Sequence, residues 1–460
     1  MSRIIRNIML LLISVSGTFL MGQNQFSLDE AIDYALKHSP ELQKSAIAQM
    51  DADAQISEYK SIGLPKVKGT LSYQYYIATP SQPVEDFITP SIYGVLFQEN
   101  VIPKKDLGTP ETFKFSFFQP NQLTAGIEVN SMLFDNTYIY GLKAAKLLKE
   151  VAAKQTAVTE YNVKDKVVKA YLSVLIAQEN VSNLQENLKN IEKSMHETKA
   201  TFNQGFAEML DVERLELSVE NLKSEIGNIS NMADISKRLL KFSMNFDSDE
   251  DIILTDDLNK TMNYLNTNIS KDIVATAQAR PELALFELNE SLDALDVKRT
   301  KSGYLPTLNG FASASGSLMR QNLFDNSETG VIPQAVVGVS MNLPIYDGGD
   351  RKAKLQRIKL RQQTNSLEKS EFVRGVKMQV ENARAGWINA KQTLEYRRKS
   401  LDTAKSIYDK TLIKYKEGVG SSIEVIQSES MFLQAQSQYT NALYDVISAG
   451  FEVKTSLGTL

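Results

Sequence analysis

Two long stretches of helical heptads, both free of proline, constrain the fold of this chain more than any other feature. Over residues 163–202 and 373–415, apolar residues recur at alternating spacings of four and three, with two gaps in the second stretch. A sustained heptad pattern predicts coiled-coil helices. A single helix over residues 137–203 would be about 100 Å long at roughly 1.5 Å per residue. Because no compact domain accommodates such a rod, the sequence predicts a mainly α-helical protein built from long helices.

The chain is also an internal duplication. Residues 39–42 (Ser-Pro-Glu-Leu) recur 241 positions later as Arg-Pro-Glu-Leu, and residues 202–205 (Phe-Asn-Gln-Gly) recur 213 positions later as Tyr-Lys-Glu-Gly. The smaller second offset means that the first copy carries an insertion. We therefore predict two copies of one architecture. The predicted boundaries are 23–243 for the first repeat, 244–272 for an equatorial connector and 273–460 for the second repeat.

A glycine follows each heptad stretch, at Gly205 and at Gly418. Glycine is the residue expected where a helix ends in a left-handed turn. We therefore predict a long helical hairpin in each copy, with one tip near residue 205 and the other near residue 418. The return helices are expected over residues 207–243 and 420–455.

Each copy also contains two stretches in which apolar or small residues alternate with polar ones. A period of two residues predicts β-strands. Each run is about 10–12 residues long, which suits a tilted membrane-spanning strand with one apolar and one polar face. A soluble antiparallel sheet shows the same alternation, and alternation alone favours that alternative. The predicted strands cover about residues 66–78 and 122–134 in the first copy and 307–319 and 335–343 in the second.

Four membrane strands per chain would require an oligomer. An open strand edge is not tolerated in lipid, and closed membrane barrels need at least about eight strands. Two chains would supply eight strands, which make a barrel filled by side chains, whereas three chains would supply twelve, enough for a lumen. If the strands span a membrane, the functional unit is therefore a homotrimer with a 12-stranded β-barrel.

A proline-rich insertion at residues 80–120 separates the two predicted strands of the first copy. It holds six of the chain's 12 prolines. Because proline lacks the backbone N–H of a helix interior, this density excludes a helix and predicts an extracellular loop. Its aromatic residues indicate a structured surface loop: Phe87, Tyr93, Phe97, Phe113, Phe115, Phe117 and Phe118.

The N-terminal segment has the pattern of an export signal. Arg3 and Arg6 precede an apolar run over residues 8–20, and the small residue Gly22 follows. The run of about 13 residues is shorter than the roughly 20 that a membrane-spanning helix needs. We expect a signal peptide at residues 1–22, with cleavage after Gly22 and export of the mature chain.

Composition excludes several classes of protein. The chain has 51 Lys and Arg against 55 Asp and Glu, so it lacks the basic excess of a nucleic-acid binder. It has no cysteine, which excludes disulfides, cysteine-ligated metals, thiol catalysis and a lipid on an N-terminal cysteine. Its two histidines, His38 and His196, lie far apart on polar helical stretches, where the simplest interpretation is a solvated helix residue. We therefore expect no catalytic residue, no metal site, no cofactor and no enzyme activity.

Several short motifs stand in a fixed order along the mature chain: 27–32 (Ser-Leu-Asp-Glu-Ala-Ile), 39–42, 303–306 (Gly-Tyr-Leu-Pro), 343–349 (Leu-Pro-Ile-Tyr-Asp-Gly-Gly) and 415–418 leading into 423–426 (Ile-Glu-Val-Ile). Their order, spacing and duplication together resemble the TolC family of outer-membrane efflux proteins. That resemblance implies a homotrimer whose strands form a barrel in the lipid of a Gram-negative outer membrane and whose hairpins form a periplasmic α-barrel. It also implies a passive duct, which receives cargo from an inner-membrane pump through a periplasmic adaptor protein.

The same resemblance implies where the pore is narrowest. The family closes its periplasmic entrance with carboxylates at helix ends, and the matching residues here are Asp211 in the first tip and Glu424 and Gln427 in the second. Gln427 replaces a second acid, and Tyr415 matches a residue that helps hold the closed state. Gly420 stands where some members carry an arginine that ties the closed helices together. Both acids are also compatible with a plain helix start, where carboxylates favour the N-terminal dipole, and Tyr415 with plain heptad packing.

The resemblance further implies that the hairpin tips meet helical hairpins of the adaptor. The expected docking residues are Gly205, Phe206 and Ala207 in the first tip and Gly418, Val419, Gly420 and Ser421 in the second.

Two other functions stay open from the residues alone. A secreted coiled-coil scaffold or adhesin without a pore would explain the heptads and the export signal, but not four strands at duplicated positions. A passive porin would explain the strands but not the long helices. We therefore expect the exit duct of a tripartite efflux or type I secretion system, and the residues do not distinguish drug, metal ion, solvent and protein as its cargo.

Overall fold

The computed structural model describes residues 24–109, 111–116, 118–247, 250–265, 280–322, 324 and 330–459. The expected signal peptide at residues 1–22 and residues 266–272 of the expected connector lie outside these residues. The chain divides into two compact units. The helical unit comprises Met1–Asp53, Lys146–Asp293 and Leu360–Leu460, and the strand unit comprises Ala54–Ala145 and Ala294–Lys359.

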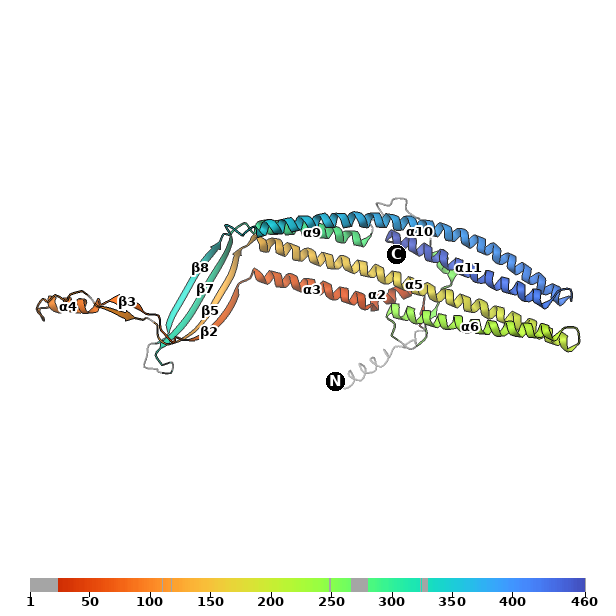
Figure 1. Ribbon diagram of the computed structural model, residues 1–460, viewed down its shortest axis with the longest axis horizontal. Coiled ribbons are helices and arrows are strands. Elements are labelled where there is room, and N and C mark those ends of the chain that lie inside the picture. Colours follow the sequence, from red (N-terminus) through yellow and green to blue (C-terminus); the bar gives the residue numbers. More distant parts are fainter. Residues whose placement is uncertain are drawn as a thin grey trace, which may run out of the picture. The chain divides into compact units, whose positions relative to one another are not determined.

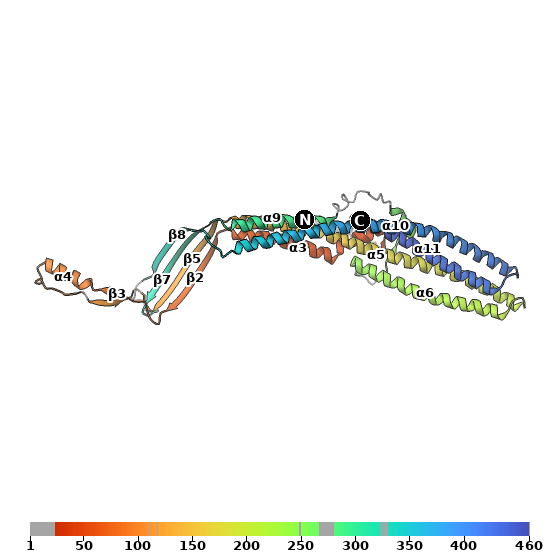
Figure 2. The same ribbon diagram turned by 45° about the horizontal axis from the view of Figure 1, so that its top comes forward.

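Each copy builds one helical hairpin from a long helix and a return helix. In the first copy α5 (Asn136–Asn203) is followed by α6 (Met209–Met244), and in the second α10 (Asp350–Lys416) is followed by α11 (Ser422–Leu457). Both ribbon views show each return helix beside the end of its long helix, with the two tips at the same end of the helical unit (Figures 1 and 2). The long helices contain 68 and 67 residues and no proline, and they confirm the predicted hairpins and the internal duplication.

Shorter helices precede the strands of each copy. These are α2 (Leu28–His38) and α3 (Pro40–Ile62) in the first copy and α9 (Pro281–Ser302) in the second. Helices α3 and α9 both begin at the proline of the recurring Pro-Glu-Leu motif. Proline is favoured in the first position of a helix, because the N–H that it lacks would have no partner there. Between the copies lie a seven-residue helix, α7 (Leu258–Tyr264), and a short strand, β6 (Ile253–Leu254). Strand β6 pairs in parallel with β1 (Gln25–Phe26), at the start of the first copy. None of the helices in the described residues combines the length and the apolar character that crossing a membrane requires.

The largest hydrophobic core joins the two copies inside the helical unit. Val167 and Val174, two heptad residues of α5, are fully buried there with Leu240 of α6 and Ile447 of α11. Burying a side chain of this size stabilises a fold by about 1.5–3 kcal/mol. The heptad stripe of α5 therefore faces helices of both copies.

The strand unit holds one antiparallel sheet of four strands, in the order β2-β5-β7-β8. The strands are β2 (Lys66–Tyr75), β5 (Asn121–Phe134), β7 (Thr307–Arg320) and β8 (Ile332–Asn342). The central pairing joins β5 of the first copy to β7 of the second. Within one chain β2 and β8 therefore form the two open edges of the sheet.

The register of the sheet aligns its apolar residues on one face. One row across the four strands is entirely apolar: Val67, Val129, Ala312 and Val337. The next row points to the opposite face and is mostly polar: Lys68, Glu128, Ser313 and Val336. On the edge strands the apolar face is open, since Val67 is 68% exposed and Val337 is 84% exposed.

Strand β2 is shorter than the alternation predicts. It ends at Tyr75, three residues before the expected end at residue 78. The N–H of Tyr76 still donates to the carbonyl of Pro120 at 2.7 Å, but proline has no N–H with which to continue the ladder. The alternating sequence pattern therefore continues past Tyr75, where the pairing of β2 with β5 ends.

The prediction that the proline-rich insertion contains no helix is wrong. Between β3 (Gln82–Glu85) and β4 (Thr112–Phe115), which pair with each other, lies an 11-residue helix, α4 (Ile88–Gln98). Pro90 is the third residue of α4, where a backbone N–H has no partner within the helix, so proline costs no hydrogen bond there. The other prolines of the insertion lie outside α4, so the high proline content of the insertion as a whole did not exclude a helix in this segment.

Candidate functional site at the hairpin tips

Both hairpin tips are built on the same turn. Gly205 has a φ of 83° and Gly418 a φ of 75°, values that favour glycine over every residue with a Cβ. The N–H of Phe206 donates to the carbonyl five residues earlier at 3.1 Å, and the N–H of Val419 does the same at 3.0 Å. This pattern satisfies the last carbonyls of a helix in the Schellman motif. The two long helices therefore end in equivalent turns, 213 positions apart.

Asp211 and Glu424 occupy the same place in the two return helices. Each is the third residue of its helix, where a carboxylate interacts favourably with the helix dipole. At α11 the hydroxyl of Ser421 caps the helix by accepting a hydrogen bond from the N–H of Glu424 at 3.4 Å. The residue before α6, Glu208, makes no such side-chain cap. The helix-start interpretation fits both acids, and their further contacts distinguish them.

A contact of three side chains ties the first tip to the second. The carboxylate of Asp211 accepts a hydrogen bond from the hydroxyl of Ser422, the first residue of α11. The guanidinium of Arg214 donates to that hydroxyl over 3.2 Å and lies 3.9 Å from the Asp211 carboxylate. A serine hydroxyl can donate and accept at once, so Ser422 bridges the two charged groups. The contact links α6 of the first copy to α11 of the second.

Tyr415 makes a second contact between the copies. Its phenol lies 3.2 Å from the hydroxyl of Thr198 on α5, a residue that is 4% exposed. Burial raises the pKa of the Tyr415 phenol above its usual value, so the phenol stays neutral near pH 7. The long helices α5 and α10 are therefore joined by a neutral hydrogen bond just before their tips.

The two tips enclose a hollow of about 580 Å³. Six of the predicted site residues line it: Phe206, Ala207, Asp211, Tyr415, Gly418 and Gly420. Glu424 and Gln427 are exposed and are not part of this lining, and neither are Gly205, Val419 and Ser421. Within one chain the structure thus brings Asp211 and Tyr415 together and leaves Glu424 and Gln427 facing outward.

Charged groups at the hollow are paired with each other. Lys416 lies 2.8 Å from the carboxylate of Glu197 across the two long helices. The hydrogen bond from Lys416 lowers the pKa of Glu197, which is therefore ionised at neutral pH.

Five residues that make these contacts were not predicted as site residues: Glu197, Thr198, Arg214, Lys416 and Ser422. The duplication offered a signal for Arg214, which stands 213 positions before Gln427, as Asp211 stands 213 positions before Glu424. Thr198 lies on the heptad stripe of the first copy, which predicted burial and not this hydrogen bond, and Ser422 has no distinctive spacing.

Gly420 cannot simply be exchanged for the arginine that some family members carry. A Cβ added at Gly420 would lie 3.1 Å from the backbone nitrogen of Tyr415, which is tighter than an ordinary contact. In this chain an arginine reaches the second tip from the other side, since Arg214 of the first copy donates to Ser422. In this chain Arg214 therefore supplies the arginine that links the two copies.

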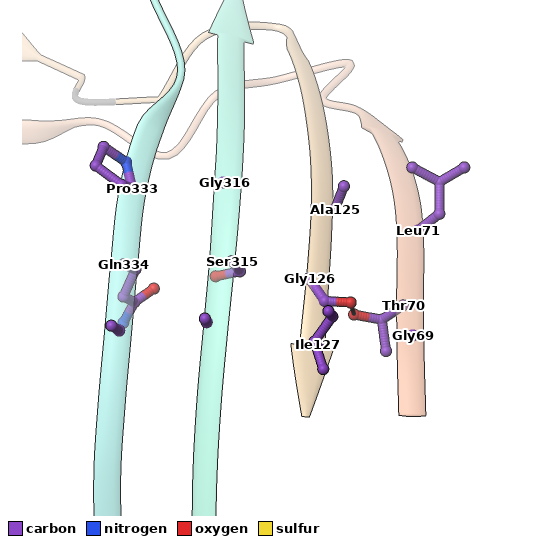
Figure 3. Close-up of a pocket in the computed structure, with 12 residues that line it drawn as sticks. Gly69, Thr70, Leu71, Ala125, Gly126, Ile127, Ser315, Gly316, Pro333 and Gln334 are labelled. Carbon is purple, nitrogen blue, oxygen red and sulfur yellow. Dashed lines mark hydrogen bonds between the residues drawn. The ribbon is translucent and has the colours of Figure 1, made fainter. Parts of the chain in front are cut away.

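A second hollow, of about 1000 Å³, lies on the sheet of the strand unit (Figure 3). Its lining crosses all four strands and consists largely of small residues. Gly126 allows β5 and β7 to approach, because a Cβ there would lie 2.8 Å from that of Ser315. Thr70 donates to the Gly126 carbonyl at 3.5 Å. No charged side chain lines this hollow, and among the described residues no group of three or more acidic or histidine side chains is placed to hold a metal ion.

Known proteins resemble this chain along both copies. A family model described as "Outer membrane efflux protein" matches residues 31–245 and 273–459. Outer membrane protein TolC of Escherichia coli is 23% identical over 387 residues, which cover 78% of this chain and 75% of TolC. Outer membrane efflux protein BepC of Brucella suis is 20% identical over 451 residues, which cover 97% of this chain and 89% of BepC.

A solved structure shows the same fold. A crystal structure of CusC superposes with a TM-score of 0.72 at 14% sequence identity and covers 94% of this chain and 92% of CusC. The long hairpins and the four-stranded sheet are thus a shared architecture at low sequence identity.

Proposed function

The chain belongs to the outer membrane efflux protein family, and from that premise we propose that it forms a trimeric channel-tunnel in the outer membrane of a Gram-negative bacterium, with a periplasmic extension. Membership places it among transport proteins and not among enzymes. The duct is passive, and it receives its cargo from an inner-membrane pump through a periplasmic adaptor protein, in tripartite efflux or type I secretion.

The observation that carries this proposal is a sheet with two open edges in a chain that also builds two equivalent hairpins. Lipid offers no hydrogen-bond partner to an open edge. Pairing β2 of one chain with β8 of the next satisfies both edges, and three chains then close a ring of about twelve strands around a lumen. The apolar row of Val67 and Val337 would face the lipid, and the row of Lys68 and Glu128 the lumen.

We place the closed end of the duct at the hairpin tips. Threefold symmetry would arrange Asp211 and Glu424 as two rings of three carboxylates, whereas a ring of Gln427 adds no charge. The tie of Asp211, Ser422 and Arg214 and the bond between Thr198 and Tyr415 support this placement, because both join the two hairpins beside the tips. Opening the duct would separate the hairpins and break these contacts.

The turns themselves are the proposed docking surface for the adaptor. Phe206 is 83% exposed and Val419 is 78% exposed, and they occupy equivalent positions directly after the two tip glycines. One exposed apolar side chain at each tip, on a turn of fixed shape, favours apolar contact with helices of a partner. The docking residues are thus Gly205, Phe206 and Ala207 together with Gly418, Val419, Gly420 and Ser421.

Conductance separates this duct from the alternative of a secreted scaffold or adhesin. Purified protein added to a planar lipid bilayer is expected to give discrete conductance steps of uniform size. A scaffold without a pore would give none, and that result would overturn the proposed function.

Replacing Gly418 by valine is expected to uncouple the duct from its partner without preventing assembly. A β-branched residue at a positive φ is strained by about 1–3 kcal/mol, so the turn changes shape. Gly386→Val is the matched control, since Gly386 lies inside α10, has no positive φ and, like Gly418, has open space around its Cβ position.

Cells that carry each variant are compared with cells in which the gene for this protein is deleted. The measured phenotype is sensitivity to added compounds or loss of a secreted protein. Gly418→Val cells should show that phenotype in full while keeping the wild-type amount of outer-membrane trimer, and Gly386→Val cells should not. If Gly418→Val cells transport normally, the tips do not dock the adaptor.

A further inference from the structure

Glu429 is a buried carboxyl group that forms no ion pair with any residue that the structure describes. It lies on α11, seven residues after Ser422, and is 3% exposed. One carboxyl oxygen, Oε2, accepts a hydrogen bond from the hydroxyl of Ser218 on α6 at 3.5 Å, and the other, Oε1, has no hydrogen-bond partner. A buried carboxylate needs a cation or a full set of donors, and Glu429 has neither in this packing.

The side chain of α10 that interacts with Glu429 is an aromatic ring, that of Tyr408. Tyr408 of α10 stacks on Phe432 of α11, with ring centroids 5.7 Å apart and planes inclined by 4°. Burial, together with smaller contributions from the negative charges of Glu429 and Asp409, raises the pKa of Tyr408 to about 12. The titratable group of α10 that interacts with Glu429 is therefore the neutral phenol of Tyr408.

Among the described residues, the ion pairs of α5 and α6 do not include Glu429 either. On α6, Arg214 lies one turn before Ser218, and its guanidinium is already held by Ser422 and Asp211. One turn beyond Glu429, Leu433 packs against an apolar cluster that includes Ile191 of α5. Glu429 thus sits between the polar tie at the tips and the apolar core of the hairpins.

The duplication makes this environment unusual. The residue 213 positions earlier is also a glutamate, Glu216, but its side chain is 44% exposed and lies 3.3 Å from the ammonium group of Lys199. The two copies therefore keep an acid at the same place and give it opposite surroundings. If residue 429 only packed the second hairpin, an apolar side chain there would stabilise the hairpin more than a buried glutamate does.

We propose that Glu429 is a proton-sensitive latch, whose protonation lets the second hairpin pack tightly against the first and whose ionisation loosens that packing. The site is the contact of α11 with α6 and α10, just behind the tips. Only the consequence for gating rests on the proposed function: the closed tips are favoured at low pH and released more easily at high pH.

The direction follows from the carboxyl group itself. Burial raises the pKa of Glu429 from its usual 4.5 to about 7, while the hydrogen bond from Ser218 acts weakly the other way. A raised pKa in an acid means that the packed state binds the proton more tightly than the loosened state does. The packing is therefore fully stabilised below about pH 4.5 and loses that stability as the pH rises through about 7. One proton per chain changes the ratio of packed to loosened hairpins by up to about tenfold per pH unit in that window.

Hydrogen exchange of the purified full-length protein in detergent tests the latch without measuring transport. Amide protection in α6 and α11 near Ser218 and Glu429 is compared at about pH 6 and about pH 8, after correction for the intrinsic effect of pH on exchange. In the wild type, protection should fall by about tenfold at the higher pH. Glu429→Gln, which cannot ionise, should keep its protection at both. The matched control in the other copy, Glu216→Gln, should behave as the wild type.

A second variant keeps the test decisive if Glu429→Gln does not fold. Ser218→Ala removes the hydrogen bond that lowers the pKa of Glu429, so the pH at which protection is lost should move upward. Protection that is independent of pH in the wild type, or equally pH-dependent in Glu429→Gln, would overturn the latch. If exchange behaves as expected and bilayers stay silent, the latch stands and the proposed duct fails.

Discussion

Replacing Asp211 by asparagine and Glu424 by glutamine together is expected to abolish block of the channel by a trivalent cation. In the proposed trimer these two residues form the two carboxylate rings at the constriction, because Gln427 carries no charge. At equal distance a trivalent cation is attracted about three times as strongly as a monovalent one, and a narrow pore limits screening by salt. Conductance in planar bilayers, with and without the trivalent cation, should therefore differ at least about tenfold for the wild type and little for the double variant.

The single variants should not be equivalent. Glu424 is exposed, whereas Asp211 is engaged by Ser422 and Arg214. Glu424→Gln alone should therefore remove most of the block, and Asp211→Asn alone should mainly raise the basal conductance by weakening the tie between the hairpins. Glu225→Gln, at an exposed position of α6 farther from the tip, is the control for a lost charge. Unchanged block in the double variant would place the constriction elsewhere.

A charge on the apolar face of the sheet is expected to prevent assembly, whereas the same charge on the opposite face is tolerated. Val337 and Val336 are neighbours in the middle of β8, and their side chains point to opposite faces. An arginine facing lipid near the bilayer midplane costs about 2–4 kcal/mol per chain, and a trimer carries three of them.

The amount of trimer in outer-membrane extracts, measured by its change in migration on heating, gives the result. Val337→Arg should lower it by more than about tenfold, since each 1.4 kcal/mol is worth a factor of ten. Val336→Arg should assemble in near wild-type amounts. Equal assembly of the two variants would mean that neither face of β8 meets lipid.

Periodic sequence patterns predicted the architecture well because they act over short distances. Heptads without proline leave a helix no place to break, and α5 begins at Asn136, one residue before the start that the sequence predicts. Glycine at the end of each stretch predicted a left-handed turn, and both turns have it. Because the chain is duplicated, each of these predictions held for both copies. The match to the family model confirms the predicted family resemblance.

Predictions from composition were less secure. Six prolines within residues 80–120 argued against a helix, yet α4 forms with Pro90 in its first turn. Proline disfavours a helix interior and not a helix start, so its position decides and its density does not.

Contacts between the copies could not be predicted from either copy alone. Asp211 and Glu424 match in sequence and in helix position, but one meets Ser422 and Arg214 while the other is exposed. Glu216 and Glu429 differ in the same way, one paired with a lysine on its own hairpin and one buried against the other hairpin. Such differences depend on the contacts between the two hairpins, and the sequence pattern of a single hairpin does not contain those contacts.

Native mass spectrometry of the detergent-purified protein tests the central claim most directly. Four strands per chain and two open sheet edges require three copies for a barrel with a lumen. We expect a stable complex of three chains as the main species. A stable monomer or dimer under the same conditions would contradict it.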